Sequence, residues 1–126
     1  GVNIDVDIIE NTDHRQCLRR KRKCHLIFDH MQGYYGVSSL ESLSQGRAVI
    51  AGLDEWNVSH IQAFAETSKI PWIVCRSGEA LEEAITSLSN DRVRLMDIGV
   101  ESREFMRRHW SDRKVTEHLI RFYASL

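Results

Sequence analysis

The sequence is poor in cysteine, and its three cysteines, Cys17, Cys24 and Cys75, form no C-x-x-C pair. An odd number of cysteines without such a pair argues against a disulfide framework and against a zinc knuckle. The six histidines show no H-E-x-x-H spacing, so we expect no metal site. Cysteine usage of this kind fits a reducing compartment, and we expect a cytoplasmic location.

Long apolar runs are also missing. No run approaches the roughly 20 residues that a membrane-spanning helix needs, and the pattern of a secretory signal is absent. With 126 residues, 42% hydrophobic and 28% charged, the chain has the composition of one globular domain. It begins at Gly1 without a methionine and passes almost directly into a strand-like pattern. We therefore expect residues 1–126 to be a single domain of a larger protein.

A large excess of either charge is absent, because 17 Lys and Arg residues stand against 18 Asp and Glu residues. Residues 15–23 nevertheless contain six cations and no acid. Such a run can meet anionic lipid headgroups or nucleic acid phosphates, or it is the solvated face of a helix. No aromatic residue is interleaved to stack on bases, so we expect no nucleic acid partner. A solvated helix and a helix at the inner face of a membrane remain as interpretations.

Four segments have the hydrophobic patterns of strands. Residues 2–8 alternate between apolar and polar side chains, which is typical of a half-exposed strand near a sheet edge. Residues 25–28, 48–51 and 72–75 are continuous apolar runs, which are typical of strands covered on both faces.

Helical patterns separate these segments. Residues 11–13 can cap a helix that carries the basic run, and apolar residues recur at helical spacing within 61–68 and 81–88. From Asn90 onward the pattern is helical only, with a break expected near Gly99. The alternation predicts an α/β domain with a parallel sheet of about four strands, helices on both faces and helices at its C-terminal end.

Open parallel sheets bind ligands beyond the carboxyl ends of their strands. The loops expected there begin at residues 10–12, 29–30, 52–54 and 76–77. The second loop is rich in glycine and runs directly into a predicted helix at residues 37–46, whose first amides would suit a phosphate group.

Each feature of that loop also has a plainer interpretation. Ser38-x-x-Glu41 reads as a capping box, in which Glu41 bonds only to its own helix. Gly33 and Gly36 can be turn glycines, and the tyrosines at 34–35 can be buried wedges.

The neighbours Asp29 and His30 resemble an acid/base pair. Adjacent strand residues point to opposite faces, however, so we expect no dyad from their proximity in sequence. A hydrolase that used Asp29, His30 and Glu41 would need these three side chains to converge in one pocket.

The stretch from Gly36 to Ala51 reads GVSSLESLSQGRAVIA. It resembles the G-x-x-x-L-E-A-M-A-x-G-x-P-V-I-A segment of retaining glycosyltransferases with the GT-B fold, the glycogen-synthase-like group. The resemblance extends across nearly the whole chain, through Leu53-Asp54, residues 79–85, Asn90-Asp91 and Phe122-Tyr123-x-x-Leu126. In that family this region is the later part of the C-terminal Rossmann-like domain, which holds the nucleotide-sugar donor.

The resemblance implies roles for individual residues. Glu41 would be the second glutamate of the family's E-x7-E pattern and would accept hydrogen bonds from the donor ribose hydroxyls. Backbone amides at the start of the following helix would cradle the donor diphosphate, and the loop at Asn11 and Thr12 would border the nucleobase. The donor-binding residues implied are Glu41, Ser38, Ser39, Val37, Gly36, Tyr35, Asn11 and Thr12.

The sequence also departs from the family. Gly33 stands where the family has its first glutamate, which contacts the donor sugar, and Ala48 stands where it has proline. The residues that neutralise the diphosphate precede this region in the family, and so does the acceptor domain, which would be a partner. We expect transfer of a sugar from UDP or GDP to an unknown acceptor, with no cofactor and with this domain inactive alone. The alternative is a non-catalytic Rossmann-like binding or interaction module that has lost the donor site.

Overall fold

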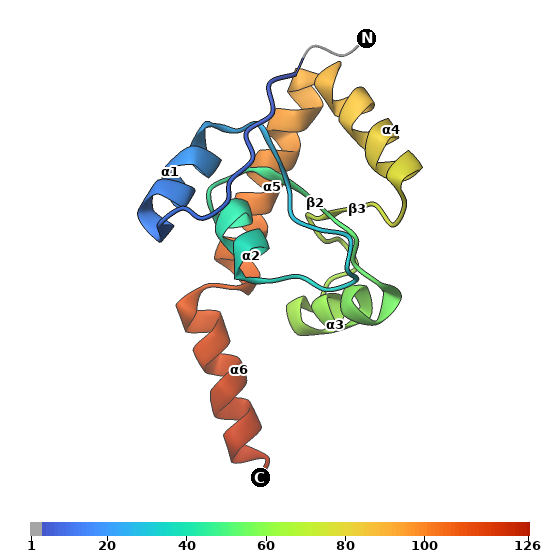
Figure 1. The fold of residues 1–126 in the computed structure, drawn as a ribbon. Helices are drawn as coiled ribbons and strands as arrows, with labels where there is room; N and C mark the ends of the chain where they lie inside the picture. The colour runs from blue at the N-terminus through green and yellow to red at the C-terminus, as the bar shows by residue number, and fades with distance from the viewer. Residues whose placement is uncertain (1–3) are drawn as a thin grey trace.

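The computed structural model describes residues 4–126, which contain three strands and six helices (Figure 1). The strands are β1 (Leu26–Phe28), β2 (Ala48–Ala51) and β3 (Ile73–Val74), and they form a parallel sheet in the order β1-β2-β3. The helices are α1 (His14–Lys23), α2 (Val37–Ser44), α3 (Glu55–Ala65), α4 (Gly78–Ser89), α5 (Arg92–His109) and α6 (Asp112–Ala124). The prediction of an α/β domain with parallel strands is confirmed.

The core lies around the central strand. All four residues of β2 are buried, and Ile27 of β1 pairs with Val49 of β2. Leu43 of α2 and Ile61 of α3 complete the core, together with the side chain of Leu53, which is also fully buried. The apolar run of β2 is therefore buried on both faces, as predicted. The same prediction is wrong at the end of β1, where Phe28 is 47% exposed, and the two residues of β3 are only partly buried.

The prediction of a fourth strand at residues 2–8 is wrong over the part that the structure describes. Val2 and Asn3 lie outside the described residues, and Ile4 to Ile8 form no strand. Ile4, Val6 and Ile8 are exposed instead of packed on the sheet. Alternation alone makes no strand, because a strand also needs a neighbour that accepts its backbone hydrogen bonds.

Side-chain caps explain where most of the helices begin. In five of the six described helices, an oxygen of the N-cap side chain accepts a hydrogen bond from an amide of the first turn. These N-cap residues are Asp13, Asp54, Ser77, Asp91 and Ser111. The helix start predicted at residues 11–13 is thus confirmed at Asp13.

The predicted break near Gly99 is also wrong, because α5 continues through this residue. Gly99 is where α5 crosses the turn between α2 and β2. A Cβ atom on Gly99 would lie 2.4 Å from the carbonyl oxygen of Gly46. The glycine therefore permits a close approach of two backbones and does not end the helix.

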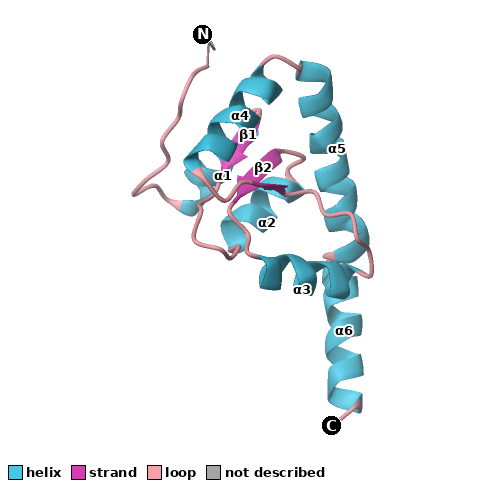
Figure 2. Ribbon diagram, turned by 90° about the vertical axis from the view of Figure 1, so that its right-hand side faces the viewer, coloured by secondary structure: helices cyan, strands magenta, loops and turns pink. Residues whose placement is uncertain are grey.

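The last helix, α6, extends away from the other elements, which gather around the short sheet (Figure 2). Within the described chain α6 has no buried residue. In the part of the chain that the structure covers, no helix is both long and apolar enough to cross a membrane.

Candidate functional site

The loops that follow the three strands meet at the carboxyl end of the sheet. Three hydrogen bonds join them: Gly52 N donates to His30 O (2.8 Å), Asp54 N to Gly33 O (2.7 Å), and Arg76 Nε to Leu53 O (2.7 Å). Three of the four predicted loops are therefore brought together. The fourth, at residues 10–12, follows no strand in the described structure.

Gly33 is a structural requirement of this junction. Its φ angle is +95°, and a Cβ atom there would lie 3.2 Å from Oδ2 of Asp54. Its carbonyl oxygen also accepts a hydrogen bond from Nδ2 of Asn57 (3.0 Å). Because bonds to Asn57 hold the pKa of Asp54 below its usual value, this carboxyl stays charged beside Gly33. A glutamate at position 33 would need a strained backbone and would add a second negative charge.

The helix that follows, α2, begins without a side-chain cap among the described residues. Its N-cap is Gly36, in extended backbone, so the first amides of α2 have no partner in their own helix. The capping box predicted for Ser38 and Glu41 is therefore wrong. Ser38 lies inside the helix, and its hydroxyl accepts a hydrogen bond from Lys21 instead of from an amide of α2.

Glu41 also faces Lys21. The ammonium of Lys21 lies 3.5 Å from Oε2 of Glu41, 2.9 Å from Oγ of Ser38 and 3.2 Å from the carbonyl oxygen of Ser38. The Lys21 side chain is only 7% exposed, and that of Glu41 is 20% exposed. This ion pair links α1 to the first turns of α2.

Asp29, His30 and Ser39 form a second polar group at the end of β1. The Ser39 hydroxyl donates to Oδ2 of Asp29 (2.5 Å), and Nε2 of His30 lies 4.0 Å from the same oxygen. The expectation that Asp29 and His30 diverge is wrong, because β1 ends at Phe28 and strand alternation no longer applies. The two residues lie in the loop, where the backbone turns.

The imidazole of His30 is not available as a base in this group. The amide of Gln32 donates to Nδ1 of His30 (3.2 Å), so the neutral ring carries its proton on Nε2 and has no lone pair left. Ser39 is fully buried, and no hydrogen bond or ion pair within the described chain joins Glu41 to Asp29 or His30. The geometry does not assemble the hydrolase considered from the sequence.

The aromatic residues of the loop divide between two environments. Tyr35 packs against Trp72 and Trp110, with ring centroids 5.4 and 5.8 Å apart, and burial raises its pKa. Tyr35 is therefore a packing residue, as its plainer interpretation predicted. Tyr34 is half-exposed and lies beside His30, with ring centroids 4.6 Å apart, so it is not a buried wedge.

Asn11 and Thr12 belong to an N-terminal arm tied to α1. Thr12 Oγ1 donates to Glu10 O (2.6 Å) and accepts from Arg20 (3.3 Å), which also pairs with Asp7. The hydrogen bond between Arg20 and Asp7 lowers the pKa of Asp7. In the described structure no hydrogen bond joins Asn11 or Thr12 to α2, and therefore none links them to the predicted donor-binding residues of that helix.

The basic run divides into two groups. Arg20 pairs with Asp7 and Lys21 with Glu41, whereas the other four cations are exposed and form no ion pair within the described chain. These four, Arg15, Arg19, Arg22 and Lys23, span about 100° of arc on one face of α1 at 3.6 residues per turn. The anionic surface expected from the sequence would therefore meet this face alone.

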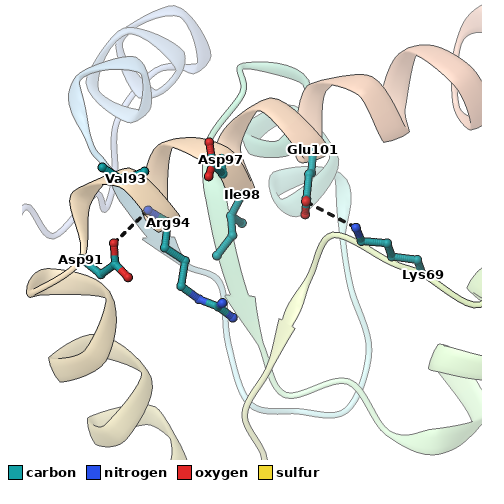
Figure 3. Close-up of a pocket in the computed structure, with 7 residues that line it drawn as sticks. All are labelled: Lys69, Asp91, Val93, Arg94, Asp97, Ile98 and Glu101. Atoms are coloured by element: carbon teal, nitrogen blue, oxygen red, sulfur yellow. Dashed lines mark hydrogen bonds and ion pairs between the residues drawn. The ribbon is translucent and has the colours of Figure 1, made fainter.

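An open hollow lies elsewhere in the structure. It has a volume of about 510 Å³, and α5 forms most of its wall (Figure 3). Lys69 and Glu101 pair across it at 3.4 Å. The hollow is open and contains none of the predicted site residues; its lining is Lys69, Asp91, Val93, Arg94, Asp97, Ile98 and Glu101.

Lys21 is the site residue that the sequence analysis missed. A signal was present, because Cys17, Lys21 and Cys24 recur at helical spacing and mark the face of α1 that turns inward. The many neighbouring cations hid this pattern, since all six were assigned to one solvated or membrane-facing run.

No match was found among protein-family models, curated proteins or solved structures. Among residues 4–126, no cluster of His, Cys, Asp and Glu side chains could hold a metal ion.

Proposed function

We propose that this chain is the nucleotide-sugar donor-binding part of a glycosyltransferase, which transfers a sugar from a nucleotide diphosphate to an acceptor held by another domain. The observation that carries the proposal is the position of Glu41. A capping box would have given this carboxylate a purely local role, but its partner is Lys21 on another helix. A partly exposed carboxylate beside an uncapped helix N-terminus suits a ligand with hydroxyls and phosphates.

The proposed binding mode divides the ligand between two parts of α2. The diphosphate accepts hydrogen bonds from the first amides of α2, near Val37 and Ser38, and Gly36 places no side chain in its way. The vicinal hydroxyls of the ribose donate to Glu41. The side chains of Ser38 and Ser39 are already engaged by Lys21 and Asp29, and the amide of Ser39 donates to Gly36 O (3.1 Å), so of the two serines only Ser38 contributes a backbone amide.

The proposed catalysis follows from the same arrangement. When the sugar leaves, negative charge grows on the diphosphate, and the partial positive charge at the start of α2 stabilises it. The acceptor domain contributes by holding the acceptor hydroxyl close to the sugar. This domain alone is then expected to bind the donor without transferring its sugar.

The second candidate function is a non-catalytic binding module, and the geometry of Gly33 favours it. The left-handed backbone at Gly33 and the nearby carboxylate of Asp54 leave no place for a sugar-binding glutamate at this position. A module of this kind would bind no nucleotide diphosphate.

A calorimetric titration with UDP, GDP and ADP tests the proposal. We expect one nucleotide to bind, and Glu41→Gln to weaken its affinity roughly tenfold without unfolding the domain, because a hydrogen bond to a charged group is lost. Glu101→Gln, in the distant hollow, is the matched control and should bind like the parent.

Two results would contradict the proposal. Absence of binding by the parent chain would favour the non-catalytic module. A lower melting temperature of Glu41→Gln with unchanged affinity would give Glu41 a structural role only.

A further inference from the structure

Lys21 is a charged side chain in a buried position, where losing contact with water is unfavourable for a charged group. Its side chain is 7% exposed, although it belongs to a run of cations whose other members reach solvent or a surface partner. Removing an ammonium group from water is unfavourable unless its protons find acceptors. All the acceptors that the described structure gives Lys21 belong to α2: the hydroxyl and carbonyl oxygens of Ser38 and a carboxylate oxygen of Glu41.

The three acceptors match the three donors of an ammonium group. Two of them lie at hydrogen-bond distance on Ser38, and Oε2 of Glu41 completes the set at 3.5 Å. With two hydrogen bonds to Ser38, an ion pair to Glu41 and a buried side chain, Lys21 has little capacity left for a ligand. Any effect of Lys21 on binding must therefore pass through the residues that it holds.

Glu41 is the residue through which such an effect passes. Its Oε2 faces Lys21, while its Oε1 forms no hydrogen bond among the described residues. A free glutamate has several rotamers, and fixing one of them before the ligand arrives removes an entropic cost from binding. The ion pair thus restricts a partly exposed carboxylate that still has one oxygen available.

We propose that Lys21 is a positioning residue, which holds Glu41 in the orientation that accepts hydrogen bonds from the ribose hydroxyls of the donor. This inference rests on the proposed function and extends it to α1. Ser38 acts as the second anchor, because its two oxygens fix the ammonium while its amide stays at the start of α2. The donor site is then built from two helices, with the ligand touching only α2.

The test compares a nucleoside diphosphate with its 2′-deoxy analogue. Calorimetry first identifies which of UDP, GDP and ADP binds the parent chain, and the matching 2′-deoxy diphosphate is then titrated. If Glu41 accepts from the ribose hydroxyls, the parent prefers the ribonucleotide, and Glu41→Gln loses most of this preference. Lys21→Met, which keeps the alkyl chain and removes the charge, should lose the preference as well, with roughly five- to tenfold weaker ribonucleotide binding.

Two further variants make the test specific. The double variant Lys21→Met with Glu41→Gln should bind no more weakly than Glu41→Gln alone, because both changes break one arrangement. Lys23→Met, which removes an exposed cation from the same helix, should bind like the parent. Lys21→Gln, which keeps a donor for Ser38, has the same expected result as Lys21→Met and serves if the latter does not fold.

The outcomes separate this inference from the proposed function. A parent chain that binds no nucleoside diphosphate overturns both. If the parent and Glu41→Gln behave as expected but Lys21→Met and Lys21→Gln keep the preference for the ribonucleotide, only the role of Lys21 is overturned. Equal weakening of both nucleotides by Lys21→Met would likewise overturn it, since it would indicate a general loss of structure.

Discussion

Individual residues near the carboxyl end of the sheet form specific polar contacts with residues of other elements. Gly33 adopts a left-handed backbone with its carbonyl oxygen bonded to Asp54 and Asn57. Lys21 of α1 pairs with Glu41 of α2, and the Ser39 hydroxyl donates to the carboxylate of Asp29. Each residue is matched to a neighbour from another element, so a change at one position leaves a specific partner unsatisfied.

Gly33→Glu, which would restore the glutamate of the family pattern, should fail to improve donor binding. We expect it to lower the free energy of unfolding by about 1–2 kcal/mol, because a side chain in the left-handed region is strained and its charge would lie near Asp54. Urea denaturation measures this loss. Gly33→Asn is the matched control, since asparagine tolerates this conformation better, and its loss should be smaller. Equal stability of Gly33→Glu and the parent would contradict the account.

The role of Gly33 depends on contacts between loops, which the sequence alone does not predict. A turn glycine was among the interpretations available from the sequence, but its φ angle and its distance to Asp54 depend on how two loops meet. The same holds for Lys21, whose helical face was visible in the spacing while its partners on α2 were not. Glu41, by contrast, was selected from the sequence, and it lies partly exposed beside the start of α2.

At the scale of elements, helix starts were more predictable than contacts between helices. The cap of α1 follows from the residues around Asp13, because capping is a local interaction. The capping box expected at Ser38 also looked local, yet the N-cap of α2 lies two residues earlier, at Gly36, and Ser38 bonds to another helix. The length of α5 was misjudged because Gly99 serves a contact that the sequence does not display.

Gly99→Ala should destabilise the packing of α5 against the turn at Gly46. Its Cβ would lie 2.4 Å from a backbone oxygen, which no side-chain adjustment relieves. We expect the free energy of unfolding to fall by about 2 kcal/mol or more, in urea denaturation followed by circular dichroism. Gly78→Ala in α4 is the control: no atom lies within 4 Å of its Cβ, so stability should change by less than about 1 kcal/mol. A similar loss in both variants would argue against the close approach.

For the whole molecule, the order of strands and helices was predictable from hydrophobic periodicity, and the size of the sheet was not. Continuous apolar runs identify buried strands such as β2, because burial on both faces leaves no polar positions. The alternating segment at residues 4–8 carries the same local signal as an edge strand, but pairing depends on a neighbour that the segment does not reach in the described structure. Local pattern therefore gives the class of fold and leaves the sheet edge undetermined.

The position of α6 leads to a prediction about the stability of the molecule. Its apolar side chains, including Leu119 and Phe122, are exposed, and the core is assembled from other elements. Its clearest contact is a stack of His118 on Phe64, with ring centroids 4.0 Å apart.

A chain that ends at Ser111 should therefore stay folded and lose no more than about 1 kcal/mol of unfolding free energy, because little buried apolar area is removed. Circular dichroism should show the loss of the 13 helical residues of α6, with tryptophan fluorescence reporting an unfolding midpoint close to that of the parent. A truncated chain that unfolds or aggregates would instead make α6 part of the cooperative core, through its contact with Phe64.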